Sequence, residues 1–201
     1  MKRAFDIILA LVGLTLTAPL IVGIAIAIRW REGGPVLYVA ERMKTPDQPF
    51  SLYKFRTMTN VPHSRNAGVT GGDKANRISP IGRKLRRFRL DELPQFINVL
   101  RGDMSFVGPR PPLRQYTDAF PDLYAKVLAS RPGVTGLASL HFHRHEERLI
   151  ASATTPAETE TIYTTRCVPR KATLDLIYQR HASVCYDAVI MWQTVRRLLK
   201  R

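Results

Sequence analysis

The sequence predicts a mainly helical α+β fold, in which a single domain follows an apolar N-terminal helix and contains one small β-hairpin. Three observations predict it. No charged side chain occurs over the 22 positions from 7 to 28. Two short strand patterns flank a turn within residues 33–58. Apolar residues recur at helical spacing in residues 79–90, in 91–102 and toward the C-terminus. The 201 residues are enough for one domain with a hydrophobic core and hardly for two.

The uncharged run from Ile7 to Ile28 is long enough for a membrane helix. At a rise of about 1.5 Å per residue, 22 residues match a hydrocarbon core of roughly 30 Å. The run is longer than a signal-peptide core and no clean cleavage site follows it, so we expect no cleaved leader. Pro19 lies near the middle of the run, where it removes one backbone hydrogen bond and bends the helix.

Basic residues flank this run on both sides. Lys2 and Arg3 precede it, and Arg29 and Arg31 follow it. The positive-inside rule therefore gives no clear orientation. Cations at both ends suit a re-entrant hairpin whose two ends lie on the cytoplasmic face, and a spanning helix is the alternative.

The overall charge indicates a polyanionic partner. The net charge is +15 and 45% of the residues are hydrophobic, which is too apolar for a disordered basic tail. Nucleic acid and the anionic cytoplasmic leaflet both fit such a charge. The two cysteines, Cys167 and Cys185, have no metal-binding spacing, so a reduced, cytosolic compartment is expected.

The elements after the apolar run can be placed from local patterns. Residues 36–39 and 50–53 are strand candidates around a turn at 45–48. The segment 61–76, with three glycines, is expected to be a loop. Ser79 and Pro80 are a favourable helix start, and that helix is expected to reach about Leu90.

The stretch from Arg83 to Pro111 carries the candidate chemistry. Five basic residues lead into the adjacent carboxylates Asp91 and Glu92. Pro94 is tolerable only in a first helical turn, so a helix is expected to begin close to Asp91. An apolar helical pattern follows, which Gly102 can terminate, and a rigid Gly-Pro-Arg-Pro turn then presents another guanidinium.

Two interpretations of the carboxylate pair follow from the residues alone. The N-terminal end of a helix favours an ionised carboxylate and equally a bound phosphate. An ionised Asp91 can act as a nucleophile toward phosphorus if a cation offsets the repulsion, and Mg²⁺ held by Asp91 and substrate phosphates is such a cation. In the other interpretation, Asp91 is an N-cap, Glu92 a first-turn charge and the arginines a solvated face.

A resemblance favours the first interpretation. The stretch contains LDELPQ followed by NVLRGDMSFVGPRP, and it resembles the bacterial sugar transferases, specifically the monotopic polyprenol-phosphate phosphoglycosyl transferases. Further similarities to this family are K-R-x-x-D at the N-terminus, a Gly-Pro pair with a following arginine, KFRTM at 54–58, RPGVTGLA at 131–138 and L-D-x-x-Y at 174–178.

The resemblance implies an activity. It is the transfer of a sugar-1-phosphate from a UDP-sugar to polyprenol phosphate with release of UMP, as a first membrane step of glycan or exopolysaccharide assembly. Asp91 is then the nucleophile that carries a covalent phosphosugar, and Glu92 is the base that assists the lipid phosphate. Mg²⁺ is the expected cofactor, held by Asp91.

The resemblance also suggests substrate- or phosphate-binding positions. They are Arg42, Arg56, Arg86, Pro109, Arg110, Pro111 and Asp175. On the residues alone, Arg42, Arg56 and Arg86 are equally well explained as surface charges, and Asp175 as a helix-surface carboxylate paired with a neighbouring cation.

The family further implies a division of the chain at the bacterial inner membrane. Residues 1–31 are expected to form a proline-broken re-entrant membrane helix, and residues 32–201 a catalytic domain on the cytoplasmic face. The membrane positions are Lys2, Arg3, Ala18 and Pro19. Many members have Ser-Pro at the break, so Ala18 lacks a hydroxyl that could satisfy a freed carbonyl.

Other expectations concern the C-terminal half. Residues 116–126 are expected to form a surface helix. Residues 188–198 form an amphipathic pattern with a basic end, which suits a membrane interface and equally a packed core helix. The sequence SLHFHR at 139–144 departs from the family, which leaves the sugar unidentified. His141, His143 and His145 alternate and are expected to share one face of a strand, with a metal site as the weaker interpretation.

A non-catalytic alternative is a basic, membrane-anchored protein that binds anionic lipid or nucleic acid. The basic residues lack interleaved aromatics for base stacking, so no nucleic-acid partner is expected. This alternative also leaves the Asp-Glu pair without a role. The sequence leaves a homodimer open.

Overall fold

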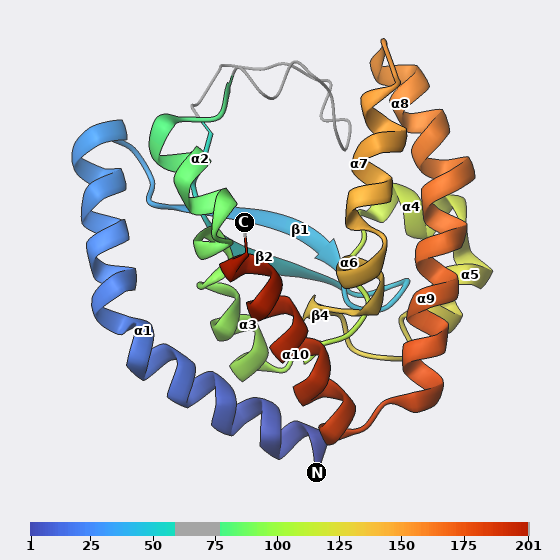
Figure 1. Cartoon of the computed structure of the whole chain (residues 1–201), viewed down its shortest axis with the longest axis horizontal. Coiled ribbons are helices and arrows are strands. Elements are labelled where there is room, and N and C mark those ends of the chain that lie inside the picture. Colours follow the sequence, from blue (N-terminus) through green and yellow to red (C-terminus); the bar gives the residue numbers. More distant parts are fainter. Residues whose placement is uncertain (59–76, 201) are drawn as a thin grey trace.

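A computed structural model describes residues 1–58 and 77–200, so the segment 61–76 lies outside the described residues. The structure is mainly helical, with a long apolar N-terminal helix and a small hairpin, as predicted (Figure 1). Its helices and strands are α1 (Lys2–Glu32), β1 (Leu37–Met43), β2 (Pro49–Phe55), α2 (Pro80–Arg87), the 3-10 turn η2 (Leu90–Glu92), α3 (Gln95–Arg101), β3 (Ser105–Val107), α4 (Arg114–Ala119), α5 (Pro121–Val127), β4 (Gly133–Thr135), α6 (Leu137–His141), α7 (His143–Ala151), α8 (Pro156–Ile162), the π-helical turn η3 (Tyr163–Cys167), α9 (Val168–His181) and α10 (Val184–Leu199).

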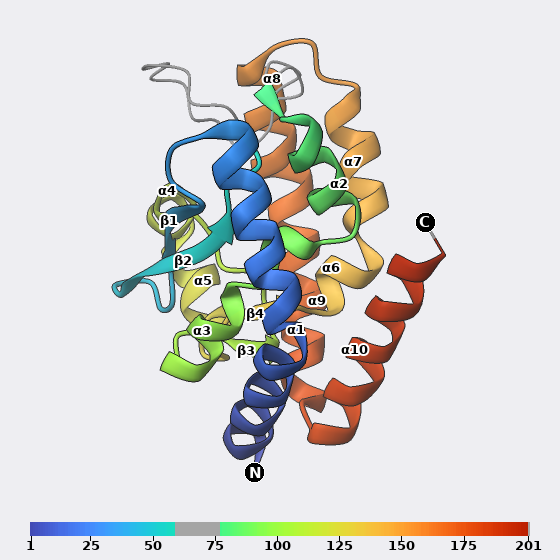
Figure 2. The same cartoon turned by 90° about the vertical axis from the view of Figure 1, so that its left-hand side faces the viewer.

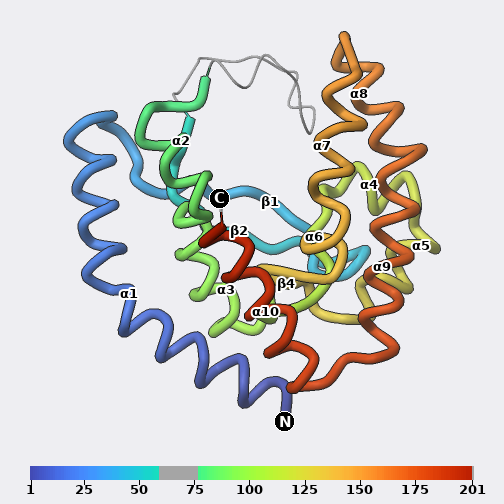
Figure 3. The backbone as a smooth tube through the Cα atoms, viewed as in Figure 1, coloured from blue at the N-terminus to red at the C-terminus, as the bar shows by residue number. Residues whose placement is uncertain are grey.

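Helix α1 bends midway along its length, which Figures 1 and 3 show as two arms that bracket α2 and α3. Pro19 lies inside the helix, where it supplies no backbone N–H to the turn before it. Thr15 and Thr17 donate hydroxyl hydrogen bonds to the carbonyls of Leu11 and Gly13 at 2.9 and 2.7 Å. Such back-bonding bends helices, so hydroxyl groups accompany the break although Ala18 has none.

Most of α1 is not covered by the rest of the protein. Only 11% of its most apolar 18-residue window is buried, although its length and composition would allow it to cross a membrane. Its inner face packs at two places, with Ala10 near α3 and β3, and with Ile24 and Ile28 near β2 and α2. Large apolar side chains cover the exposed face, namely Ile8, Leu11, Val12, Leu16, Leu20, Val22, Ile26 and Trp30.

The predicted hairpin is present and longer than expected. β1 and β2 pair antiparallel from Leu37↔Phe55 to Met43↔Pro49. Thr45 lies in the connecting turn, and its hydroxyl accepts a hydrogen bond from the Gln48 N–H at 3.1 Å. The inner face of the hairpin is buried through residues that include Ala40 and Leu52, and this packing sets its register.

Helix boundaries agree with the sequence in part. Ser79 caps α2 through a hydrogen bond from Gly82 N–H, and Gly102 ends α3 at φ 85°, both as predicted. The helix expected to begin near Asp91 is instead a 3-10 turn followed by α3. The single helix expected over 116–126 is two helices, because Pro121 begins a new one at its first turn.

Helices α8, η3 and α9 follow one another along the right-hand side of the molecule in Figure 1. α5 and α7 pack against these helices around a hydrophobic core that contains Tyr163 and Cys167, and α6 packs against α9. Figure 2, which views the molecule from the side of α1, shows α10 on a neighbouring side, with the starts of both helices at the same end.

A short parallel pair, β3 and β4, was not predicted. It joins Ser105 to Gly133 and Val107 to Thr135. All three residues of β3 are buried and lie between α1 and α10. This small pair leads directly into the turn that carries Arg110, so it positions the site described next.

Candidate active site

The carboxylate pair lies on the 3-10 turn η2, immediately after a left-handed residue. Arg89 has φ 54°, and no other non-glycine residue among those described has a positive φ. Such a conformation costs of order 1 kcal/mol and is frequent at functional sites. It turns the chain sharply after α2, and Asp91 and Glu92 become buried, at 9% and 7% exposure.

Glu92 is surrounded by three cations from separate parts of the chain. Its Oε1 accepts hydrogen bonds from Lys54 Nζ at 3.0 Å and Arg110 Nη2 at 2.9 Å. Its Oε2 accepts one from Arg89 Nη1 at 3.2 Å. Arg110 and Lys54, together with Arg89, hold the pKa of the buried Glu92 carboxyl well below its usual range, against the opposing effect of burial. Glu92 is therefore a stable anion in this site.

Asp91 has a different environment. Burial, followed by the neighbouring Glu92 charge, raises its pKa, while Lys54 and Arg86 act in the opposite direction. Within residues 1–58 and 77–200, no other side chain forms a hydrogen bond or ion pair with its carboxylate. Asp91 is thus an available carboxylate next to one that is fully engaged.

Arg86 lies on the last turn of α2 and reaches toward the same place. Its Nε donates to Thr57 Oγ1 at 2.8 Å, and its side chain is otherwise exposed. The charge of Arg86 lowers the pKa of Asp91. Arg86 therefore acts electrostatically on Asp91, and its binding to a substrate phosphate stays a prediction.

The Gly-Pro-Arg-Pro turn is held by close backbone packing. Pro109 and Pro111 are buried, whereas 40% of the Arg110 side chain is exposed. A Cβ on Gly108 would lie 2.2 Å from the Arg131 carbonyl, and one on Gly136 would lie 2.1 Å from the Gly108 carbonyl. Only glycine fits at such contacts, so the two family-like loops at 108–111 and 131–138 depend on each other.

Arg42 lies close to Arg110. Burial and then the Arg110 charge lower the pKa of Arg42. Its Nη1 donates to the Glu41 carbonyl at 2.7 Å, and among the described residues it forms no ion pair. The site therefore contains more cations than carboxylates, and this excess favours a polyanionic ligand.

Two other residues predicted to bind substrate, Arg56 and Asp175, do not contact the carboxylate pair. The Arg56 guanidinium is buried and donates to the Gly33 carbonyl, so it ties the end of α1 to β2. Gly34 has φ 62°, a left-handed conformation that favours glycine.

Asp175 is buried in α9 and accepts a hydrogen bond from the Ala138 N–H at the start of α6. Burial raises its pKa to about 7, and no hydrogen-bond partner of Oδ1 is found in the described part of the chain. The alternative of a surface carboxylate paired with Arg170 or Lys171 is wrong, because Lys171 pairs with Glu146 at 3.0 Å and Asp175 is not at the surface.

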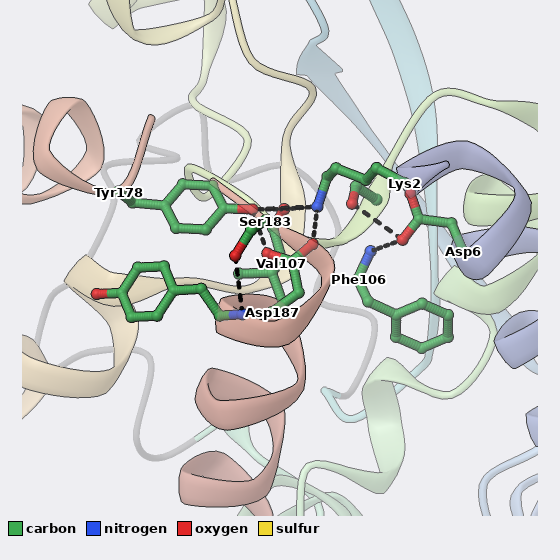
Figure 4. Close-up of polar contacts among 9 residues, drawn as sticks. Lys2, Asp6, Phe106, Val107, Tyr178, Ser183 and Asp187 are labelled. Carbon is green, nitrogen blue, oxygen red and sulfur yellow. Dashed lines mark hydrogen bonds and ion pairs between the residues drawn. The ribbon is translucent and has the colours of Figure 1, made fainter. Parts of the chain in front are cut away.

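The expected membrane residues divide into two groups. Ala18 and Pro19 are exposed at the bend of α1. Lys2 contacts Asp187, the Tyr178 hydroxyl and the Val107 carbonyl (Figure 4). Arg3 donates to carbonyls at the end of α3. The two basic residues thus fasten the start of α1 to the domain.

Sequence reasoning missed Lys54 and Arg89 as site residues. Lys54 belongs to the KFRTM stretch, but only its half-buried position on β2 and its bond to Glu92 reveal its role. Arg89 was one of five cations before the pair, and the basic run gave no sign of its left-handed backbone.

The residues present fit a magnesium site with one protein ligand. The part of the chain that the structure describes has no cluster of three or more His, Cys, Asp or Glu side chains. Mg²⁺ commonly uses one or two carboxylates together with substrate phosphates and water. Among residues 1–58 and 77–200, no side chain binds the Asp91 carboxylate, whereas the Glu92 oxygens are occupied by cations.

The three histidines do not lie on a strand, so that prediction is wrong. His141 ends α6, and His143 and His145 belong to α7. His145 contacts Arg170 at 2.9 Å, and His143 lies 3.3 Å from Glu147. Residues two apart on a helix point in different directions, which argues against a shared metal.

The chain matches known proteins along its length. The sequence model of the family described as bacterial sugar transferase matches residues 1–201. A UDP-N-acetylgalactosamine-undecaprenyl-phosphate N-acetylgalactosaminephosphotransferase of Aeromonas hydrophila is 31% identical over 98% of this chain and 43% of its own length. A UDP-glucose:undecaprenyl-phosphate glucose-1-phosphate transferase of Escherichia coli K12 is 34% identical over 97% of this chain and 39% of its own length.

A protein of Caulobacter vibrioides with the same UDP-glucose activity in its name is 36% identical over 98% of this chain and 69% of its own length. The chain therefore spans about two fifths of the Aeromonas and Escherichia proteins and about two thirds of the Caulobacter protein. The names of these relatives share an undecaprenyl-phosphate acceptor and differ in the sugar.

Proposed function

The chain belongs to the bacterial sugar transferase family, and from this we propose that it transfers a sugar-1-phosphate from a UDP-sugar to polyprenol phosphate and releases UMP. The observation that carries the proposal is the pairing of an available Asp91 with a Glu92 that holds three cations. Such a site offers a nucleophile and an excess of positive charge to a diphosphate.

We assign the nucleophile to Asp91. A carboxylate oxygen attacks the β-phosphorus of the UDP-sugar, the bond from that phosphorus to the bridging oxygen breaks, and UMP leaves with that oxygen and its electron pair. An oxygen of polyprenol phosphate then attacks the same phosphorus, and the bond to Asp91 breaks. One phosphoanhydride is exchanged for another, so the overall reaction is close to reversible.

The role of Glu92 differs from the base that the resemblance suggested. A carboxylate with a strongly lowered pKa, bound by Lys54, Arg89 and Arg110, is a weak base. A phosphate monoester has a second pKa near 6, so the lipid phosphate is mainly dianionic at neutral pH and needs no base. We therefore assign Glu92 to holding the three cations in place around the transferred phosphate.

Arg110 is the best placed cation to grip that phosphate. Among the described residues its guanidinium makes one hydrogen bond, through Nη2 to Glu92, which leaves donors and 40% of its side-chain surface for substrate. A guanidinium can bind phosphate oxygens in pairs, which an ammonium cannot. Arg42 adds positive charge near Arg110, and Arg86 adds it near Asp91. Mg²⁺, when bound at Asp91, supplies charge neutralisation for the diphosphate.

We further propose that residues 1–31 form a re-entrant membrane helix and that residues 32–201 act at the cytoplasmic face of the inner membrane. The bend at Pro19 and the exposed apolar face of α1 support this. α10 adds an exposed apolar stripe of Val189, Trp192, Val195 and Leu199, opposite the face that buries Ile190. We propose that this stripe lies at the membrane interface.

The test is to incubate purified protein with Mg²⁺ and a panel of UDP-sugars, without lipid, and to measure intact mass. A phosphosugar adduct is expected in the wild type and in Asp118→Asn, a matched change at an exposed aspartate, and is expected to be absent in Asp91→Asn. UMP release only after addition of polyprenol phosphate would replace the covalent route by direct transfer. Neither adduct nor UMP, with lipid present, would favour the non-catalytic binding protein.

A further inference from the structure

The first turn of α1 is connected to the turn that carries Arg110. The Lys2 ammonium lies 3.2 Å from the Val107 carbonyl and 3.0 Å from the Tyr178 hydroxyl, and it forms an ion pair with Asp187 (Figure 4). The Tyr178 hydroxyl oxygen lies 3.1 Å from the Val107 carbonyl oxygen, and its single proton is shared between this carbonyl and the Asp187 carboxylate. Val107 is the last residue of β3 and precedes the Gly-Pro-Arg-Pro turn by one bond.

Two members of this polar network are buried, whereas 36% of the Lys2 side chain is exposed. Tyr178 and Asp187 are each 1% exposed. Tyr178 also bonds to Asp187 at 2.5 Å, and burial with the Asp187 charge raises the pKa of the tyrosine. Lys2 of α1 and Tyr178 of α9 therefore meet at a single backbone carbonyl, and Asp187 of α10 binds both of these side chains. Buried polar groups that satisfy one another in this way fix a unique geometry.

A second contact holds the preceding residues of β3. Asp6 is 1% exposed, and its Oδ1 accepts hydrogen bonds from Ser105 Oγ and Phe106 N–H, both at 3.1 Å. On its other side the strand is fixed by β4, because Gly108 N–H donates to Thr135 at 3.0 Å. The first turn of α1 thus specifies where β3 ends and where the following turn begins.

We infer that Lys2, Tyr178 and Asp187 are positioning residues, which set the Val107 carbonyl and through it the place of Arg110 beside Glu92. This inference rests on the proposed function in one respect, that Arg110 acts on the transferred phosphate. According to this inference, Arg110 is correctly placed for phosphate only when α1 and α10 are packed in their observed positions.

The test compares Tyr178→Phe and Lys2→Met with Arg3→Met. Tyr178→Phe removes only the hydroxyl and keeps the ring, so it remains informative if Lys2→Met fails to fold. Arg3→Met removes one cation from the same helical turn, but its contacts are the Val99 and Leu100 carbonyls at 2.5 and 2.8 Å and not β3. Each change is made in the wild type and in Arg110→Ala.

The first readout is kcat/KM for UMP release with polyprenol phosphate. Tyr178→Phe and Lys2→Met are expected to lower it about 10- to 100-fold in the wild type, as expected for a displaced phosphate ligand. In Arg110→Ala they are expected to lower it less than about twofold, because the group they position is gone. Arg3→Met is expected to act equally in both backgrounds. Equal losses in both backgrounds for Tyr178→Phe would overturn the inference.

The second readout does not depend on activity. Hydrogen exchange of the peptide 105–113, followed by mass spectrometry, is expected to accelerate in Tyr178→Phe and Lys2→Met. In Arg3→Met the faster exchange is expected within 96–103 only. Unchanged exchange at 105–113 in Tyr178→Phe would overturn the inference whatever the kinetics. Faster exchange there in a protein that releases no UMP would uphold the structural coupling and reject the proposed function.

Discussion

The Arg110 guanidinium lies 2.9 Å from the Glu92 carboxylate, and this ion pair joins the turn after β3 to the 3-10 turn before α3. Both residues belong to the stretch from Arg83 to Pro111, and the ion pair joins two parts of this stretch in space. Lys54 from the hairpin and Arg89 also form ion pairs with Glu92. Because Glu92 forms ion pairs with three cations, we expect its main role to be to hold these cations in position.

Glu92→Gln is expected to destabilise the protein by about 1–3 kcal/mol at pH 7, since it leaves three partly exposed cations close together without the carboxylate charge that compensates them. The pKa of Glu92 is lowered in the folded state, so its contribution is present above the ordinary value of 4.5 and is lost as the pH falls below it. The free energy of unfolding should therefore fall less between pH 7 and pH 4 in the variant than in the wild type. Urea unfolding at pH 7 and pH 4 measures both effects.

Glu41→Gln is the matched control for this prediction. Glu41 forms a single ion pair with Arg114 at 3.0 Å, and 58% of its side chain is exposed. Such a pair contributes roughly 0–1 kcal/mol. If Glu92→Gln cost no more than Glu41→Gln, the three ion pairs would not hold the site together.

Asp91→Asn is expected to have the opposite effect on stability. Burial and the adjacent Glu92 raise the Asp91 pKa, so its ionised form opposes folding at neutral pH. The amide is therefore expected to increase the free energy of unfolding by about 0.5–2 kcal/mol, a size common for removal of a functional conflict. Thermal unfolding at pH 7.5 without Mg²⁺ measures it. A less stable, inactive variant would indicate that Asp91 is a structural residue.

Asp175 is expected to titrate near neutral pH. Its pKa is raised by burial to about 7. A raised carboxyl pKa means that the folded state binds the proton more tightly, so stability falls as the pH rises from about 4 to about 7 and is constant above that. Asp175→Asn is expected to remove this dependence and to stabilise the protein at pH 8 by at most about 4 kcal/mol. Unfolding curves of both proteins between pH 4 and pH 8 provide the measurement, and parallel curves would contradict it.

How much of this site could be predicted from sequence depended on whether the signal is local. Ser79, Gly102 and the turn at 45–48 act through neighbouring residues, and the structure confirms them. The proximity of Arg86 to the carboxylates also follows from a short separation along the chain.

Contacts between distant segments left no such signal. The parallel pair of β3 and β4 depends on three-residue strands, too short for a recognisable period. Lys54 lies 38 residues from Glu92, and Lys2 lies 185 from Asp187. The sequence does not show whether a charged side chain is buried. Lys2 and Arg3 were therefore expected at the membrane surface, whereas the structure shows that both contact the domain.

The path of α1 gives the last prediction. If the helix is re-entrant, Ala4 and Trp30, both exposed near its two ends, lie on the same side of the membrane. Single cysteines at these positions, made in a Cys185→Ser background because Cys167 is buried, are expected to react equally with an impermeant maleimide in inside-out vesicles. Labelling of only one of them would establish a spanning helix.

Pro19→Leu tests the cause of this topology. Leucine restores the backbone N–H that proline lacks and favours a straight helix, which at about 1.5 Å per residue is long enough to cross the bilayer. Because residues 32–201 stay at the cytoplasmic face, we expect the cysteine at position 4 to become inaccessible from the cytoplasmic side in part of the population. If labelling remained unchanged, the contacts of Lys2 with Asp187 and of Arg56 with Gly33 at the two ends would be sufficient to impose the bend.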